Sequence, residues 1–253
     1  MSLSDGTLTY TADLKGIQLR SVDVPIGQAP IQKVTIESDG ADTLRLTFHV
    51  AQVVSEMDAR LVCDTLAEEL TEKIAFHEVV AVGRPRFSGS TLTRQEVNAD
   101  GTTHPVVQAG VSIRASASFS AVAIRALSPS LLSALQSGPR TTSPGRAYYS
   151  LFRTALDQED VLARYMACYG ILLLLCGDNQ AAVDACIRAE EPGVLETARP
   201  DKPKIQETVY TRLRNQVGHV RKGVTVESTR TEMDSHIGGL LSLTRVLIAK
   251  QIS

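Results

Sequence analysis

The sequence predicts an N-terminal α+β domain, built from an antiparallel sheet and one long helix, followed by an all-α up-and-down helix bundle. Apolar residues recur with a period of about two in much of residues 1–138 and of about 3.6 in residues 141–253. Between these patterns lies the stretch 137–145, SGPRTTSPG, whose serine, glycine and proline content is typical of an interdomain linker. We therefore expect two domains, at 1–138 and 141–253.

The first domain is expected to begin with strands at 7–14, 17–25, 31–36 and 43–50. Alternation is clearest in the first and the last of these, where every second side chain is apolar (Leu8, Tyr10, Ala12, Leu14; Leu44, Leu46, Phe48, Val50). A long helix should follow at 56–75, because Ser55 is a good N-cap and Val62, Leu66, Leu70 and Ile74 form one apolar stripe.

The rest of the first domain is expected to add two more strands and a short helix. A strand is predicted at 79–87. Residues 88–105 are rich in Ser, Thr, Gly and Asn, and the sequence Asn98-Ala99-Asp100-Gly101 within them indicates a hairpin loop or a mobile segment. The longest alternating segment of the chain, 107–121, predicts a bent or bulged strand. A short helix at 128–135 should end before Gly138-Pro139.

The second domain should contain five helices. The 3.6-residue spacing of apolar side chains predicts them, and Ser143-Pro144, Asp160, Asn179 and the pair Thr229 and Glu232 supply starting signals for four of them. Prolines and a glycine at 192–203 indicate an irregular connection before the fourth. The expected ranges are 144–156, 160–176, 180–189, 204–217 and 229–248.

Composition limits the classes of function. The net charge is −2, so no global field attracts nucleic acid or membrane, but residues 202–230 hold seven cations and two acids, a local balance of +5. The cysteines lack metal-ligand spacing, and those at 168, 176 and 186 lie in apolar stretches, which predicts core thiols and a reducing compartment. With no secretory signal or bilayer-length apolar run, we expect a cytoplasmic protein without metal, cofactor or membrane association.

The candidate site is the stretch Arg214-Asn215-Gln216-Val217-Gly218-His219, near the end of the fourth predicted helix. Asn215 and His219 are four residues apart and share a helix face, whereas Arg214 and His219 are separated by roughly 140° around the helix axis. Gly218 can end the helix and let His219 turn towards Arg214. The alternative is an ordinary helix terminus, where the dipole favours a histidine.

This stretch, in a late helix of a C-terminal bundle, resembles the R-x4–6-H motif of the HEPN superfamily, in which a polar residue often follows the arginine. The resemblance covers residues 141–253, and the whole chain is also similar to MauJ-type methylamine-utilisation accessory proteins. The HEPN resemblance implies a dimeric, metal-independent endoribonuclease that cleaves RNA through a 2′,3′-cyclic phosphate, as in toxins and phage-defence effectors. Arg214 would hold the scissile phosphate and His219 would transfer protons. Asn215 would orient either the phosphate or His219.

The resemblance also implies a homodimer through the C-terminal bundle and a basic surface that binds RNA. Arg212, Arg221, Lys222 and Arg153 are the candidate substrate-binding cations. Arg221 stands where many HEPN toxins have a tyrosine that is modified by an antitoxin, which argues against that mode of control. The N-terminal domain would bind a regulatory protein or a nucleotide.

Two other functions remain open from the sequence. A non-catalytic HEPN or MauJ-like module would dimerise and bind a nucleotide or a protein partner, with Arg214 and His219 as ligand contacts. An enzyme with its active site in the N-terminal domain is disfavoured, because that domain contains no phosphate-binding glycine loop, nucleophile elbow or HExxH sequence.

Overall fold

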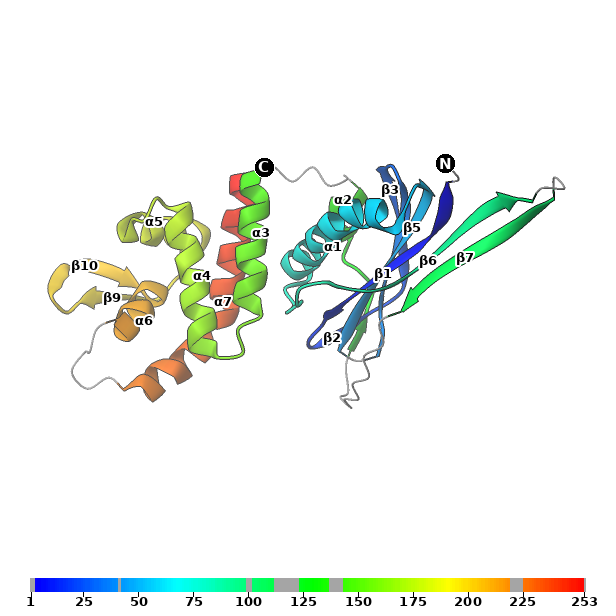
Figure 1. Cartoon of the computed structure of the whole chain (residues 1–253). Helices are drawn as coiled ribbons and strands as arrows, with labels where there is room; N and C mark the ends of the chain where they lie inside the picture. Colours follow the sequence, from blue (N-terminus) through cyan, green and yellow to red (C-terminus); the bar gives the residue numbers. More distant parts are fainter. Residues whose placement is uncertain are drawn as a thin grey trace. The chain divides into compact units, whose positions relative to one another are not determined.

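The computed structural model describes residues 3–40, 42–98, 102–111, 123–136, 143–218 and 225–252. The chain divides into two compact units, Met1–Arg140 and Thr141–Ser253, which are described separately here (Figure 1).

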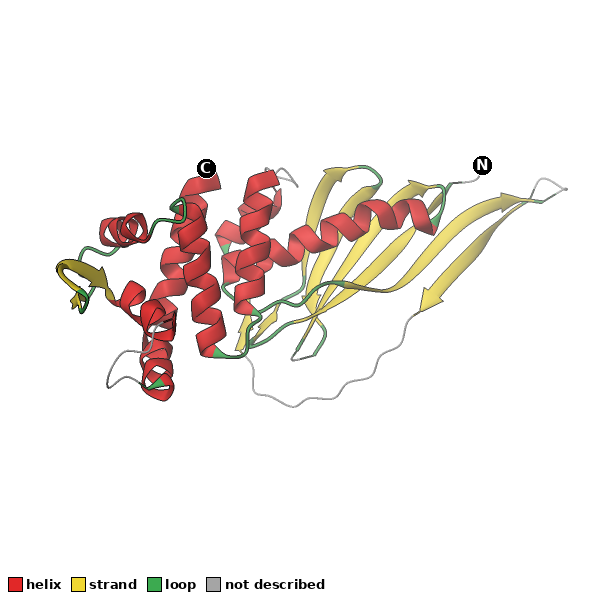
Figure 2. Ribbon diagram, turned by 60° about the vertical axis from the view of Figure 1, so that its left-hand side comes forward, coloured by secondary structure: helices red, strands yellow, loops and turns green. Residues whose placement is uncertain are grey.

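The first unit is built on a six-stranded antiparallel sheet. Its strands follow the order β3-β4-β5-β1-β6-β7. The helix α1 (Glu56–Glu78) lies across one face of the sheet (Figure 2). Apolar side chains from the central strands, such as Leu8 and Phe48, are fully buried. The strand bounds are β1 Ser4–Asp13, β3 Val22–Gln28, β4 Ile31–Ser38, β5 Thr43–Val53, β6 Arg86–Val97 and β7 Thr103–Val111.

The predicted long helix is confirmed, together with its N-cap. The side chain of Ser55 accepts a hydrogen bond from the backbone N–H of Asp58, which satisfies one of the free donors of the first turn. Beside α1 lies α2 (Pro129–Gln136), and Lys73 Nζ donates to the carbonyl of Ala134 at 3.1 Å. A short parallel pair, β2 (Ile17–Leu19) with β8 (Ala123–Arg125), completes the unit.

The hairpin signal at 98–101 falls between β6 and β7, which pair antiparallel, although residues 99–101 lie outside the described residues. The strand predicted at 79–87 was wrong in its bounds, because β6 begins only at Arg86 and continues to Val97. This strand pairs with β1 on one side and with β7 on the other, so its backbone groups are satisfied although its side chains are mostly polar. The predicted strand 107–121 is present as β7 up to Val111, and its remainder, 112–122, lies outside the described residues.

The second unit is mainly helical. Its helix α4 packs against α3 and against the last helix, α7. Phe152, Tyr165, Leu172, Leu240 and Ile248 are buried. Asp160 caps α4 by accepting from the N–H of Ala163, as its position in the sequence predicts. The helices are α3 Ser143–Leu156, α4 Val161–Leu175, α5 Gln180–Glu190, α6 Val209–Gly218 and α7 Val226–Ile252.

The expectation that this unit is all-helical was wrong between α5 and α6. Two strands, β9 (Glu196–Arg199) and β10 (Lys202–Thr208), form an antiparallel hairpin there. The hairpin replaces the first turn of the helix predicted at 204–217, and α6 begins only at Val209. Backbone pairing with β9, for example Glu207 with Thr197, therefore overrides the local helix signal.

In the described part of the chain, no single helix has both the length and the apolar composition needed to cross a bilayer. The helices α4 and α5 meet that criterion only as a pair, and they are bent by 98° relative to each other.

Candidate functional site

The arginine and asparagine of the predicted motif lie in the second half of α6. Asn215 is 4% exposed, whereas Arg214 is partly exposed. Arg214 Nη1 donates a hydrogen bond to Asn215 Oδ1 at 3.0 Å, and its guanidinium carbon lies 5.9 Å from the centre of the Tyr169 ring. The amide oxygen and the aromatic face therefore hold the guanidinium group in place from two sides.

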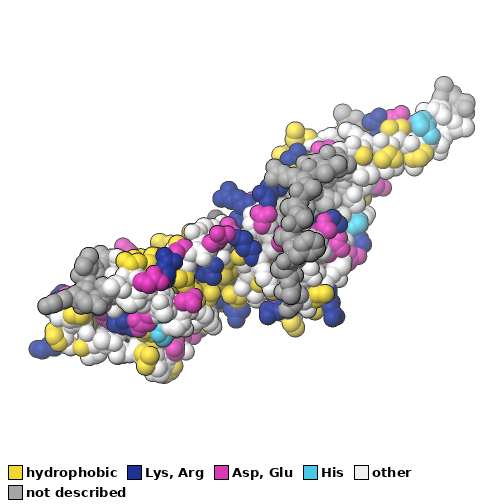
Figure 3. Space-filling model, turned by 90° about the horizontal axis from the view of Figure 1, so that it is seen from below, with side chains coloured by type: hydrophobic (Ala, Val, Ile, Leu, Met, Phe, Trp, Pro, Cys, Tyr) yellow, Lys and Arg dark blue, Asp and Glu magenta, His cyan; other side chains and the backbone are white. Residues whose placement is uncertain are grey.

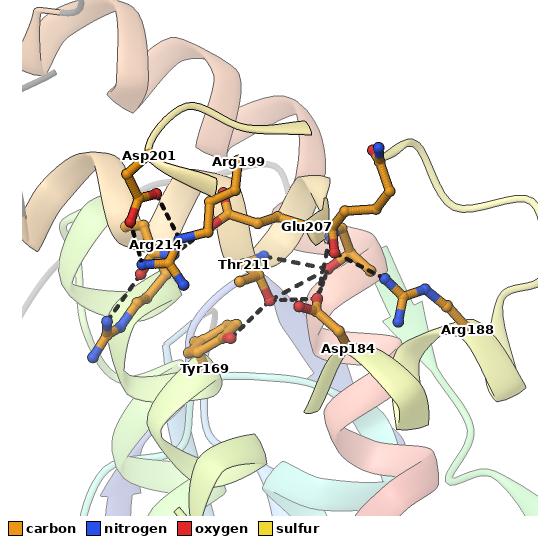
Figure 4. Close-up of polar contacts among 11 residues, drawn as sticks. Tyr169, Asp184, Arg188, Arg199, Asp201, Glu207, Thr211 and Arg214 are labelled. Atoms are coloured by element: carbon orange, nitrogen blue, oxygen red, sulfur yellow. Dashed lines mark hydrogen bonds and ion pairs between the residues drawn. The ribbon is translucent and has the colours of Figure 1, made fainter. Parts of the chain in front are cut away.

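Asn215 is held in turn by a buried carboxylate, Glu207 on β10. The Asn215 Nδ2 group donates to Glu207 Oε1 at 2.9 Å, and Glu207 is 1% exposed. Arg199 of β9 faces the same carboxylate, with Nε 3.5 Å from Oε1, and it also binds Asp201 (Figure 4). The hairpin thus supplies the acceptor that fixes the orientation of the Asn215 amide, and through it the position of Arg214.

A second set of buried hydrogen bonds fixes the start of α6. Asp184 on α5 is 5% exposed, and its Oδ1 accepts from Thr208 N at 3.2 Å, from Thr208 Oγ1 at 2.6 Å and from Thr211 Oγ1 at 2.7 Å. Thr208 precedes α6 and accepts from the N–H of Thr211, as an N-cap does. A buried acid therefore ties α5 to the first turn of the helix that carries Arg214.

Tyr169 of α4 joins the two sets (Figure 4). Its hydroxyl lies 2.7 Å from Thr211 Oγ1, which donates its own proton to Asp184, so the tyrosine is the donor. Burial raises the pKa of Tyr169 to about 12, which keeps the hydroxyl protonated and able to donate at neutral pH. The face of the same ring is the surface over which Arg214 lies.

Of the predicted site residues that the structure describes, it brings together Arg214 and Asn215. Arg212 points elsewhere, because its guanidinium group makes hydrogen bonds from both Nη1 and Nη2 to the carboxylate of Glu232 on α7. Arg153 belongs to α3, which packs on α4 and α7 rather than in the hairpin. His219, Arg221 and Lys222 lie outside the described residues, and His219 follows the last residue of α6 in the sequence.

Sequence reasoning missed the groups that support Arg214. Glu207 offered one signal, since it is one of two acids among the seven cations of residues 202–230. Asp184 offered none, because an aspartate in an amphipathic helix is usually a solvated residue. Tyr169 is buried in the apolar helix that the sequence predicts at 160–176, but nothing in the sequence indicates its hydrogen bond to Thr211.

The charges are otherwise interspersed. Lys and Arg side chains are mixed with Asp and Glu side chains on the face drawn in Figure 3. Among the residues that the structure describes, no group of three or more histidines, cysteines or acids could hold a metal ion. Compared with known proteins, the chain matches no family model, no curated protein and no solved structure, so the site stands on its own geometry.

Proposed function

We propose that the second unit is a metal-independent endoribonuclease of the HEPN type, in which Arg214 binds the scissile phosphate and His219 transfers protons. The observation that supports this most strongly is that the Arg214 guanidinium group forms no ion pair within the described part of the chain. Arg188, Arg199 and Arg212 each face a carboxylate, whereas no described residue forms an ion pair with Arg214.

A guanidinium group prepared in this way suits a phosphate. One of its N–H groups donates to Asn215 Oδ1, and its central carbon lies over the ring of Tyr169. The remaining donors are arranged as a rigid fork that matches two phosphate oxygens. Because the side chain is already ordered by its neighbours, binding an anion costs little additional conformational entropy.

The proposed reaction is an internal transfer at phosphorus. The RNA 2′-hydroxyl attacks the adjacent phosphorus as its proton passes to a base, and the 5′-oxygen of the next nucleotide leaves after receiving a proton from an acid. The products are a 2′,3′-cyclic phosphate and a 5′-hydroxyl end. Histidine suits both proton transfers, since its ordinary pKa is about 6.5. Arg214 would stabilise the added negative charge of the transition state.

The dimer and the remaining cations belong to this proposal. Two copies of the second unit would face each other, so that one His219 acts as base and its counterpart acts as acid. Arg221 and Lys222 follow His219 in the sequence and would contact neighbouring phosphates. The first unit would bind a regulatory protein or a nucleotide that controls the nuclease.

The test is an RNA-cleavage assay with the full chain in excess chelator. Wild type should cleave, and Arg214→Ala and His219→Ala should each abolish cleavage while circular dichroism shows them folded. Lys250→Ala is the control cation, because Lys250 pairs with Glu190 near the C-terminal end of α7, whereas α6 contacts the first turns of α7 through Gln216 and Thr229. Products ending in a 3′-phosphate that never passes through the cyclic form, or equal activity in all variants, would refute the mechanism.

A second candidate function is favoured by the burial of Asn215 and Glu207. A binding module for a nucleotide or an acidic protein partner would also need an ordered Arg214, without any need for His219 as an acid or base. In that case a nucleotide or a short RNA would bind without being cleaved. Arg214→Ala would weaken binding and His219→Ala would leave it unchanged.

A further inference from the structure

Two of the four cysteines lie in contact at the junction between α4 and α5. Cys176 and Cys186 have their Sγ atoms 3.5 Å apart, and both side chains are partly exposed. Cys63 and Cys168 are fully buried, each within its own helix. The expectation of core thiols is therefore confirmed for Cys168 and wrong for Cys176 and Cys186. The exposure of these two depends on the direction of α5 relative to α4, which the sequence does not show.

The contact between the two sulfurs does not depend on a loose loop. Cys176 ends α4, and its N–H donates to the carbonyl of Leu172 at 3.0 Å. The N–H of Asp178 donates to the carbonyl of Leu173 at 2.8 Å. Gly177 and Asp178 both have positive φ angles, so the chain makes a tight turn directly after α4. Asn179 then caps α5. This corner fixes the helix that carries Cys186 relative to the end of α4.

We propose that Cys176 and Cys186 form an intramolecular disulfide when the protein meets a low-molecular-weight disulfide such as oxidised glutathione. One cysteine thiolate attacks the small disulfide and releases one small thiol. The second cysteine then attacks the mixed disulfide, releases the other small thiol and completes the protein S–S bond. Two thiol hydrogens leave the protein, the small disulfide is reduced, and the sulfurs need to approach by about 1.5 Å.

The bond would act on the polar network of the candidate site. Asp184 and Cys186 are two positions apart on α5, so they lie on opposite faces of the helix. Asp184 already ties one face of α5 to Thr208 and Thr211 at the start of α6. The disulfide would tie the other face to α4, the helix that supplies Tyr169. In the oxidised protein the disulfide would fix α5 relative to α4. Asp184 would then hold the first turn of α6 more firmly against both helices.

The experiment oxidises the full chain with oxidised glutathione and analyses it without reduction. We expect a monomer lighter by two hydrogens, a peptide pair linked through Cys176 and Cys186, and unmodified thiols at Cys63 and Cys168. Burial and the adjacent Cys186 raise the pKa of Cys176 to about 11, so the thiolate is scarce and the sample is followed to equilibrium. The midpoint of thermal unfolding should rise by about 5–10 °C and fall back with reductant.

Hydrogen exchange tests the link to the site. Amides at 208–213 should exchange more slowly in the oxidised protein, and Cys186→Ser, treated in the same way, should show neither the slower exchange nor the higher midpoint. Stable glutathione adducts on both cysteines, disulfide-linked dimers, or four free thiols at equilibrium would each overturn the proposal. A linked pair without slower exchange would overturn the connection to α6. None of these readouts depends on nuclease activity.

Discussion

Asn215 Nδ2 donates to Glu207 Oε1 at 2.9 Å, and both side chains are buried. The bond joins the hairpin strand β10 to α6, and Arg214 depends on it because the Asn215 oxygen accepts from the guanidinium group. A buried amide that loses its acceptor costs more free energy than the bond itself contributes, since the N–H group stays away from water. The pair therefore couples the stability of the unit to the geometry of the site.

Replacing Glu207 with alanine should lower the free energy of unfolding of the second unit by about 2–3 kcal/mol, because the Asn215 amide loses its acceptor and Arg199 loses one of the two carboxylates that it faces. Glu207→Gln keeps an oxygen for Asn215 and should cost about half as much. Five of the six tyrosines lie beyond residue 141, so tyrosine fluorescence in a urea titration reports on this unit. Equal losses in the two variants would contradict the assigned hydrogen bond.

Two neighbouring cations on α6 should respond differently to lysine. Arg214→Lys should reduce RNA cleavage by about 100-fold, since an ammonium group cannot bind phosphate as a fork. Arg212→Lys should change cleavage by less than about threefold, because Arg212 faces Glu232 in a pair that lysine can also make. Both rates come from the same assay at one salt concentration. Similar losses in the two variants would place Arg212 in the RNA-binding surface after all.

Asp184→Asn should destabilise the second unit by about 1–2 kcal/mol. The substitution removes the charge that strengthens the bonds from Thr208 and Thr211, and it adds a buried N–H group to a site filled with donors. The matched control is Asp178→Asn at the exposed α4–α5 corner, which should change stability by less than about 0.5 kcal/mol. A urea titration of both variants decides the matter, and equal midpoints would mean that Asp184 is not the anchor of α6.

Adjacent glycines on α7 offer a test of the contact between α6 and α7. A Cβ at Gly239 would lie 2.3 Å from the Tyr210 hydroxyl, which also donates to Glu191 at 3.0 Å. Gly239→Ala should therefore cost about 1–3 kcal/mol, because the ring must move and its hydrogen bond weakens. At Gly238 nothing lies within 4 Å of an added Cβ, so Gly238→Ala should raise stability by about 0.5–1 kcal/mol through helix propensity.

Thermal unfolding measured side by side gives the sign for each glycine variant. A gain in stability at Gly239, or a loss at Gly238, would show that α7 approaches α6 with the other face.

Prediction from the sequence succeeded where one face of an element is buried. The strands β1 and β5 and the helix α1 lie within a few residues of their expected positions, because a half-buried element imposes its period on the local sequence. It failed at β9 and β10. The strand β10, KPKIQET, is mostly exposed and shows no alternation, so its pairing with β9 could not be inferred from local pattern.

The sequence by itself determined the succession of sheet and helices, the cap residues at 55, 160 and 179, and the adjacency of Arg214 and Asn215 on one helix. Only the tertiary structure decided which residues hold that pair, namely Glu207 from the hairpin and Tyr169 from α4. It also decided that Asp184 from α5 fixes the start of the helix. The reason is physical. A periodic pattern records how one element meets water and core, whereas a hydrogen bond between distant residues depends on the positions of several elements at once.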